Sequence, residues 1–259
     1  MSSASRTPHL RRSNLALVLD QVRRRGPCSR LVRATGLTRS AIAGLVAELQ
    51  GLGLVIEEPS ESDGRPGRPS PIVRIDDRSI GALAIEIFID EIGAGIVALD
   101  GSVVRSVRLA RTRDRVNIDA TVADVATLLD ELAEHTRRDE CHLIGCGVSV
   151  PGLVRDIDGL VIAAPNLGWI DVALGEALAP FLDGDLPISV GNDADLGALA
   201  ESRFGAGVGS GQMHFVSGEV GVGGGLVAAG RPIVGTHGFA GEIGHFPVNP
   251  DGQRCRCGS

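Results

Sequence analysis

Residues 35–50 read TGLTRSAIAGLVAELQ, and this stretch decides how the N-terminal part of the chain folds. Gly36 permits a tight turn, and Thr38 is a good N-cap for a helix over residues 39–50. The apolar side chains of that helix recur at helical spacing and would face a core; they are Ile42, Leu45, Val46 and Leu49. The stretch therefore predicts a turn followed by an amphipathic helix.

Two further helical patterns precede this turn. Residues 12–25 carry apolar side chains at helical spacing and stop at Gly26, and a second, short helix begins near residue 29. Short polar side chains at the start of the second helix of a helix-turn-helix can approach base edges and phosphates in the major groove. The third pattern has such side chains on its free face, namely Thr38, Arg39 and Ser40.

Residues 54–75 complete this module. A polar, Gly- and Pro-rich loop over residues 60–71 separates two short extended segments, as in a β-hairpin. Arg65 and Arg68 lie near the tip of the loop, where they could enter a minor groove or hold phosphates. We therefore predict a winged helix-turn-helix DNA-binding domain over residues 1–78. The alternative is a small helical adaptor whose arginines form a solvated face.

The distribution of charge agrees with a DNA-binding module. Residues 1–56 hold nine arginines and two acids, a net charge of 9 − 2 = +7, whereas residues 57–259 hold 16 arginines and 30 acids, a net charge of 16 − 30 = −14. A basic segment joined to an acidic body suits a domain that meets phosphates attached to one that does not. The sequence has neither a membrane-spanning apolar run nor a secretory signal, so we expect a cytoplasmic protein.

From residue 79 onward the pattern changes to strands, glycine turns and helices, which is typical of an α/β domain. The expected elements are strands over 82–89, 95–99, 143–150, 188–190 and 214–216, and helices over 116–137 and 194–204. A glycine-rich loop is expected over residues 221–225. The fold class is therefore α/β, with a second domain over residues 79–259.

Both domains contain short sequence motifs. In the first they are Ser29-Arg30, Thr35-Gly36-Leu37-Thr38 and Gly64-Arg65-Pro66. In the second they are Val150-Pro151-Gly152, Ala164-Pro165-Asn166-Leu167-Gly168-Trp169, Asn192-Asp193-Ala194 and Gly241-Glu242-Ile243-Gly244-His245. Together they resemble the ROK family of repressors, unassigned reading frames and sugar kinases, and the first set resembles its repressor branch. The resemblance adds Ser29 and Arg30 to the DNA-contacting side chains. It also implies an actin-like (ribonuclease H-like) fold with sugar between two lobes.

By this resemblance, five side chains would contact sugar hydroxyls: Asn166, Asn192, Asp193, Glu242 and His245. Amide, carboxylate and imidazole groups make several directional hydrogen bonds, which sugar recognition requires. Each of these residues alone could equally cap a helix or form a core hydrogen bond, but the ordered set favours a sugar site. The effector would be a small sugar or amino sugar, because the contacts are generic to several sugars.

Phosphoryl transfer would require a cradle for the phosphates of ATP, built from backbone amides that glycine leaves uncovered. Kinases of the family have Asp-x-Gly-Gly-Thr after the first strand, where this chain has Glu86-Ile87-Phe88-Ile89-Asp90. The glycines over 221–225 would be a second cradle, and Asp193 would be the base in a kinase. With the first cradle lost, we predict sugar binding without catalysis, and no use of ATP.

A structural zinc site is also implied by the resemblance. His245, Cys255 and Cys257 resemble three ligands of the family pattern, which ends in Cys-x-Cys-Gly-x-x-Gly-Cys, and imidazole and thiolates suit tetrahedral zinc. One ring nitrogen of His245 could bind the metal while the other faces the sugar. The sequence stops before the final Gly and Cys of the pattern, so we expect a C-terminally truncated chain with an incomplete second lobe and zinc site.

The leading hypothesis is a repressor of sugar-metabolism genes that binds double-stranded operator DNA as a homodimer or a dimer of dimers. A small sugar bound in the non-catalytic second domain would regulate it. The first alternative is a ROK-family, ATP-dependent sugar kinase with an appended DNA-binding head. The second is a remnant that keeps DNA binding but no longer senses sugar.

Overall fold

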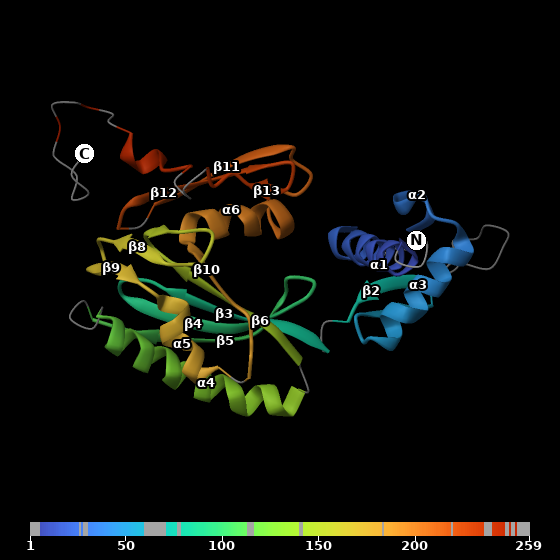
Figure 1. Ribbon diagram of the computed structural model, residues 1–259, viewed down its shortest axis with the longest axis horizontal. Helices are drawn as coiled ribbons and strands as arrows, with labels where there is room; N and C mark the ends of the chain where they lie inside the picture. The colour runs from blue at the N-terminus through green and yellow to red at the C-terminus, as the bar shows by residue number, and fades with distance from the viewer. Residues whose placement is uncertain are drawn as a thin grey trace. The chain divides into compact units, whose positions relative to one another are not determined.

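The computed structural model describes residues 6–25, 27, 31–59, 71–76, 79–112, 117–139, 142–182, 184–218, 220–235, 240–246, 249 and 252. The chain divides into two compact units, whose elements are labelled in Figure 1. Unit 1 comprises residues 1–81, 98–102 and 140–142, and unit 2 comprises residues 82–97, 103–139 and 143–259. Within the described ranges, no helix is long and apolar enough to cross a membrane.

Unit 1 contains three helices and a two-stranded antiparallel sheet. The elements are α1 (Arg6–Arg25), α2 (Leu31–Thr35), α3 (Arg39–Gly51), β1 (Val55–Glu58) and β2 (Ile72–Ile75). The first helix, expected from residue 12, already begins at Arg6. The predicted loop between the two strands, with Arg65 and Arg68, lies outside the described residues, as do Ser29 and Arg30.

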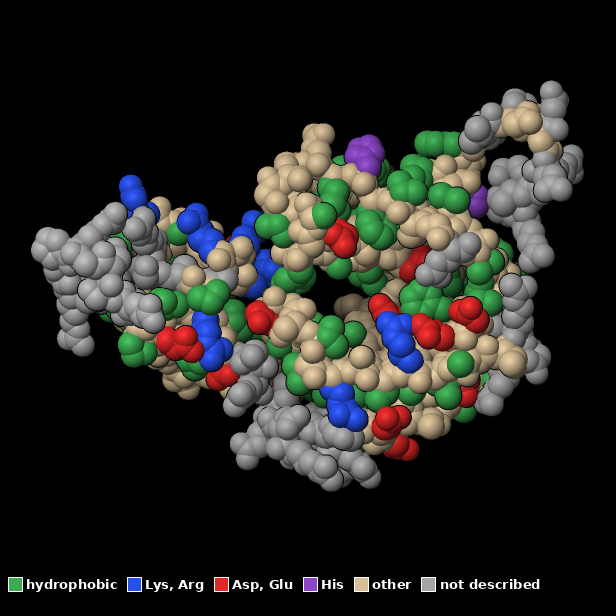
Figure 2. All heavy atoms as spheres, turned by 180° about the vertical axis from the view of Figure 1, so that it is seen from behind, with side chains coloured by type: hydrophobic (Ala, Val, Ile, Leu, Met, Phe, Trp, Pro, Cys, Tyr) green, Lys and Arg blue, Asp and Glu red, His purple; other side chains and the backbone are tan. Residues whose placement is uncertain are grey.

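The core of unit 1 forms where its helices meet the hairpin. Val18 and Val22 of α1 are fully buried, and all four apolar side chains expected to face the core from α3 are buried, as predicted. Gly36 has a φ of +71°, and its N–H donates to the Val32 carbonyl oxygen at 3.0 Å, which confirms the tight turn before α3. Basic side chains gather on the surface of unit 1, whereas acidic ones are frequent on unit 2 (Figure 2).

Unit 2 is built on a five-stranded sheet with the strand order β10-β6-β3-β4-β5. In chain order the strands are β3 (Ile80–Ile87), β4 (Glu91–Ala98), β5 (Val103–Ala110), β6 (His142–Val150) and β10 (Ile188–Asn192). The sheet is mixed, because β4 and β5 are antiparallel whereas β6 and β10 are parallel. Helix α4 (Ile118–Asp139) lies on one side of this sheet and α6 (Asp193–Phe204) on the other (Figure 1). The prediction of an α/β domain is thereby confirmed.

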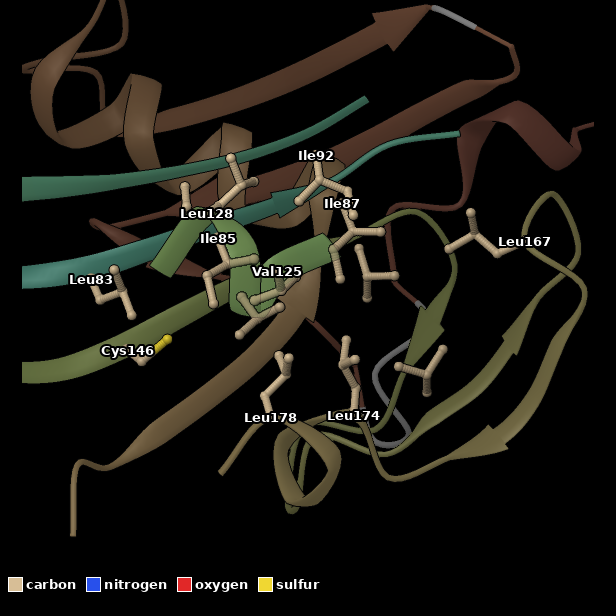
Figure 3. Close-up of a cluster of buried hydrophobic side chains, with 14 of the residues drawn as sticks. Leu83, Ile85, Ile87, Ile92, Val125, Leu128, Cys146, Leu167, Leu174 and Leu178 are labelled. Atoms are coloured by element: carbon tan, nitrogen blue, oxygen red, sulfur yellow. The ribbon is translucent and has the colours of Figure 1, made fainter. Parts of the chain in front are cut away.

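An apolar core fills the space between this sheet and α4. Alternate residues of β3 are buried, and Leu83, Ile85 and Ile87 lie in one cluster with Val125 and Leu128 of α4 (Figure 3). Apolar side chains recur at every second residue along β3 and at helical spacing along α4. Each element therefore has one apolar face, and the two faces pack together away from water. This packing fixes the position of the strand end at Ile87.

Two smaller three-stranded sheets complete unit 2. One contains β7 (Leu153–Val154), β8 (Val161–Ala164) and β9 (Trp169–Val172), and the other contains β11 (Gln212–Gly218), β12 (Val222–Ala228) and β13 (Arg231–Pro232). Helix α5 (Leu174–Leu178) and the short 3-10 helix η2 (Ala179–Phe181) follow β9, and a second 3-10 helix, η3 (Ile243–His245), follows β13. Helix α6 packs against β11 and β12.

The expected loop over residues 221–225 is wrong, because Val222 to Gly225 belong to strand β12. The glycines of this strand are needed for close packing rather than for a turn. A Cβ on Gly225 would lie 2.5 Å from the Ala194 carbonyl oxygen of α6, and one on Gly224 would lie 2.6 Å from the Gly241 carbonyl oxygen. Only glycine lets both segments approach the strand so closely.

The buried core of unit 2 predicts the effect of shortening Ile92, which is fully buried on β4. We expect Ile92→Ala to lower the free energy of unfolding by about 2–5 kcal/mol, because it removes buried methyl groups and leaves a cavity. Trp169, the single tryptophan of the chain and buried in the same core, reports the transition in a urea titration followed by fluorescence. The matched control is Val103→Ala on β5, where the side chain is 64% exposed and the change should stay within about 0.5 kcal/mol. Equal effects of the two substitutions would contradict this packing.

Candidate functional site

Asn192 brings two of the predicted motifs together. Parallel pairing of β10 with β6 sets Asn192 opposite Val150, at the end of β6. The Asn192 Nδ2 donates to the Gly152 carbonyl oxygen at 2.9 Å, and its Oδ1 accepts from the N–H groups of Ala194 and Asp195 at 2.8 and 3.1 Å. Asn192 is therefore the N-cap of α6, and it ties this helix to the segment that follows β6.

Asp193 is the first residue of α6 and is partly buried. Its Oδ1 accepts a hydrogen bond from the Ala194 N–H at 2.9 Å, and the unpaired N–H groups at the start of a helix favour a negative charge there. The charge of Asp193 contributes to a raised pKa of Glu242, which shows that the two carboxyl groups lie near one another. Two segments far apart in the sequence thus direct carboxylates to one region.

Glu242 and His245, two of the sugar contacts implied by the resemblance, lie close together in the structure. Both belong to the segment around η3, and His245 Nε2 lies 3.3 Å from Glu242 Oε2. Burial is the largest cause of the raised pKa of Glu242, followed by the charge of His245, which lowers it, and that of Asp193, which raises it. Three of the five predicted sugar contacts are thus connected through Glu242, whose pKa responds to both His245 and Asp193.

Asp195 is a member of this cluster that sequence reasoning missed. It is the third residue of α6, its Oδ1 is shielded from solvent, and this oxygen has no hydrogen-bond partner among the described residues. Burial, followed by the charges of Glu242, Asp193 and Asp156 in that order, raises the pKa of Asp195 to about 6. The sequence did offer a signal for Asp195, since it is the third carboxylate- or amide-bearing residue in Asn192-Asp193-Ala194-Asp195. Its burial, however, depends on how the rest of the chain folds.

The other predicted site residues of unit 2 are not joined to this cluster. Asn166 is exposed in the turn between β8 and β9. Two of the predicted zinc ligands, Cys255 and Cys257, lie outside the described residues. Among the residues that the structure describes, no group of three His, Cys, Asp or Glu side chains is placed to hold a metal ion.

The predicted DNA-contacting residues of unit 1 that the structure describes lie at the start of α3. Thr38 is the N-cap, its Oγ1 accepts from the Ala41 N–H at 3.3 Å, and it lies 3.3 Å from the Ser40 hydroxyl. Arg39 and Ser40 are exposed. The helix start therefore presents a guanidinium and two hydroxyls to solvent, which can contact phosphates and base edges.

The segment at the position of the first phosphate cradle is a tight connection between β3 and β4. The Phe88 N–H donates to the Glu91 carbonyl oxygen at 2.9 Å, and the Arg111 N–H donates to the Asp90 carbonyl oxygen at 2.8 Å. Ile89 is buried in the same apolar cluster as the end of β3. This connection is thus fixed by backbone hydrogen bonds and by a side chain that belongs to the core.

Comparison with known proteins matches the sequence model described as ROK family to residues 82–259. The xylose repressor of Bacillus subtilis (strain 168) is 27% identical over 96% of this chain and 64% of its own length. A glucokinase of Halalkalibacterium halodurans is 39% identical over 52% of this chain and 41% of its own length. The chain thus spans less than two thirds of the length of these curated relatives.

A solved structure gives the same picture for the fold. The crystal structure of a ROK family transcriptional regulator, a homolog of the E. coli MLC protein, superposes with a TM-score of 0.73 at 25% identity. The superposition covers 97% of this chain and 63% of that chain. The likeness therefore includes the helices and hairpin of unit 1 as well as unit 2.

The raised pKa of Asp195 predicts a pH dependence of stability. Because the folded-state pKa of about 6 lies above the ordinary value of 3.8, protonation favours the folded chain, and stability is lost as the pH rises from about 4 through 6. Asp195→Asn removes this loss. At pH 7.5 we expect the variant to be more stable than the wild type by on the order of 1–2 kcal/mol, after a discount for partial exposure, and nearly equal at about pH 3, below both pKa values. Urea titrations followed by Trp169 fluorescence measure both values, and a difference independent of pH would contradict the assignment.

Proposed function

The chain belongs to the ROK family, and from that premise we propose that it is a DNA-binding transcriptional repressor of sugar-metabolism genes, regulated by a small sugar. One observation carries the proposal. Likeness to the Bacillus subtilis xylose repressor extends over 96% of this chain, whereas likeness to the Halalkalibacterium halodurans glucokinase extends over 52%. A regulator therefore accounts for unit 1, and a kinase alone does not.

In this proposal unit 1 is a winged helix-turn-helix domain that binds double-stranded operator DNA. Helix α2, the turn at Gly36 and helix α3 form the helix-turn-helix, and the β1–β2 hairpin carries the wing. Arg39 is exposed at the start of α3 and would contact phosphate or base edges, together with Thr38 and Ser40. Ser29, Arg30, Arg65 and Arg68 are proposed to add phosphate contacts.

The proposed sugar site is the cluster at the start of α6. Asp193, Glu242 and His245 supply carboxylate and imidazole groups that can bond to sugar hydroxyls, and Asn166 is proposed as a further contact. We assign Asn192 a positioning role, because both ends of its carboxamide already have partners within the protein. An effector bound here would change DNA affinity only by binding the two DNA-affinity states unequally.

Binding without catalysis is supported by the connection between β3 and β4. A phosphate cradle needs exposed backbone N–H groups, but here the Phe88 N–H is bonded to Glu91 and Ile89 belongs to the apolar core. The alternative is an ATP-dependent ROK sugar kinase with a DNA-binding head. The retained Asp193 favours it, since this carboxylate could serve as a base.

We also propose structural zinc held by His245, Cys255 and Cys257. The donor set fits the metal, because zinc prefers imidazole nitrogen and thiolate sulfur in tetrahedral sites. Zinc would hold the segment after η3 against the rest of unit 2.

DNA binding is tested by titrating a labelled duplex from the region upstream of the gene with the full chain. We expect Arg39→Ala to weaken binding about tenfold, because it removes one charged contact to DNA. The matched control is Arg231→Ala, an exposed arginine of unit 2 that should leave affinity unchanged. A panel of hexoses, pentoses and amino sugars is then added to the complex. DNA binding that responds to no sugar would favour a remnant that no longer senses sugar. Equal DNA affinity of the Arg39→Ala and Arg231→Ala variants would contradict the proposed DNA-binding role of unit 1.

The absence of catalysis is tested by ADP release with ATP, magnesium and the same sugars. We expect no sugar-dependent release from the wild type, because the first phosphate cradle is filled by bulky side chains. Asp193→Asn serves as the background control. Sugar-dependent release by the wild type that disappears in this variant would overturn the proposal and establish the kinase alternative.

A further inference from the structure

The segment that runs from β4 into the following turn contributes side chains to two apolar cores. Ile92 and Ala94 of β4 belong to the core cluster of unit 2. Leu99, the first residue after β4, packs against the core cluster of unit 1, and the turn that holds it, the β4–β5 turn (residues 98–102), is part of unit 1. One continuous stretch of chain therefore has side chains in both cores.

Hydrogen bonds hold the β4–β5 turn in a defined conformation. The Ala98 N–H donates to the Ser102 carbonyl oxygen, and the Gly101 N–H donates to the Ala98 carbonyl oxygen, both at 2.9 Å. Asp100 Oδ1 accepts from the Ser102 N–H at 2.9 Å and from the Ser102 hydroxyl at 2.7 Å. Gly101 has a φ of +91°, which favours glycine there. Because the turn is closed in this way, Leu99 moves together with the end of β4.

Leu99 is an apolar side chain at a position where turns normally carry polar residues. It is partly buried against a cluster that includes Leu49 of α3 and Val55 of β1. Side chains in a packed core do not shift singly, because they interdigitate with few voids and transmit strain to their neighbours. The position of the β4–β5 turn therefore bears on the packing of α3, the helix that begins with the exposed Arg39.

The sheet of unit 2 connects this turn with the candidate sugar site. Asn192, at the end of β10, caps α6 and thereby positions Asp193. From β10 the sheet continues through β6 and β3 to β4, and each strand is hydrogen-bonded to the next. A change of sheet geometry at β10 can thus reach the end of β4 and move Leu99.

A second segment of unit 1 continues into the sheet of unit 2, at the start of β6. The His142 N–H donates to the Ser79 carbonyl oxygen at 2.9 Å, and both residues are part of unit 1. His142 is exposed, and neither residue belongs to the core cluster of unit 1. This link joins backbone groups only, whereas Leu99 packs against the core that α3 shares. Leu99 is therefore the residue through which a change in β4 reaches α3.

We propose that the β4–β5 turn couples unit 2 to unit 1, with Leu99 as the side chain that carries the coupling. A change in the sheet of unit 2 shifts the turn, and the shift alters how α3 packs in the core of unit 1. The inference rests on the proposed function for its biological meaning, because it supplies the route by which a bound sugar would change DNA affinity. The coupling itself requires neither DNA nor sugar and can be measured without them.

The test is a double-mutant cycle in the full chain, read by hydrogen exchange of the α3 amides with mass spectrometry. Ile92→Val is the perturbation of unit 2, because it removes one buried methylene group from β4 and keeps the site apolar. We expect it to speed the exchange of the α3 amides about threefold in the wild-type background. In the Leu99→Ala background the same perturbation should change this exchange by less than about 1.5-fold, because the side chain that carries the coupling is gone.

The matched control is Leu19→Ala on α1, another partly buried leucine that packs against the core cluster of unit 1. This substitution also loosens unit 1, but Leu19 does not belong to a segment that continues into unit 2. Ile92→Val should therefore still speed α3 exchange about threefold in the Leu19→Ala background. Leu99→Met, which nearly conserves the side-chain volume, should keep the wild-type response. Because each comparison is a ratio within one background, a general loss of stability in unit 1 cancels.

Three results would overturn the inference. They are no effect of Ile92→Val on α3 in the wild type, the full effect in the Leu99→Ala background, and loss of the effect in the Leu19→Ala background as well. Circular dichroism and Trp169 fluorescence establish that each variant is folded. If Leu99→Ala does not fold, Leu99→Val takes its place as a smaller truncation and should give a response between those of the wild type and of a decoupled chain.

The outcomes also separate the coupling from the proposed function. A coupling that is lost in Leu99→Ala supports the inference even if the chain binds no duplex, in which case only the repressor proposal fails. Conversely, a sugar that changes DNA affinity equally in the wild type and in Leu99→Ala leaves the repressor proposal standing and rejects this turn as the route.

Discussion

The hydrogen bonds of the Asn192 side chain are the constraint on which the candidate site depends. One carboxamide donates to the carbonyl oxygen of Gly152, 40 residues earlier in the sequence, and accepts from two N–H groups of α6. The end of β6, the end of β10 and the start of α6 are therefore held at one point. Because this partly buried amide would lose all of these bonds together if it moved, the direction in which Asp193 leaves the strand is fixed by the fold and not by a ligand.

The carboxyl groups near the start of α6 destabilise the folded chain, and this cost indicates a role other than stability. Asp195 has a carboxylate oxygen shielded from solvent, and the charges of Glu242, Asp193 and Asp156 act against its ionisation. A stability optimum would not place these groups together, since each pair of like charges in a partly buried region raises the free energy of the folded chain. Perturbed ionisable groups gather at functional sites, which agrees with the sugar site proposed here.

The parts of the structure that could be predicted from sequence are those set by local periodicity. The buried face of α3 was predicted because Ile42 to Leu49 repeat at helical spacing, and the turn at Gly36 because a positive φ suits glycine. The glycines of β12 were predicted to form a loop, because a glycine needed for close packing looks the same in sequence as one needed for a turn. Asp195 was missed because its pKa is raised first by burial and then by charges that include Glu242 and Asp156, and all of these depend on parts of the chain distant in sequence. The proximity of Glu242 and His245 is local, because the two residues are three apart in the sequence.

A kinase of this family needs glycines after β3 to bind phosphate, whereas a sensor can have large apolar side chains there that stabilise the core. Ile87 and Ile89 are both buried in the apolar core of unit 2, and the connection between them and β4 is closed by backbone hydrogen bonds. The two glycines of the family pattern correspond to Phe88 and Ile89, and glycines there would expose N–H groups to phosphate but would remove the buried Ile89 side chain from the core, at a cost of about 2–5 kcal/mol. A chain that only binds sugar gains stability from isoleucine there and loses nothing that it uses. Asp193 can remain in such a chain, because a carboxylate that accepts a hydrogen bond from a hydroxyl contributes to affinity whether or not a proton is ever transferred.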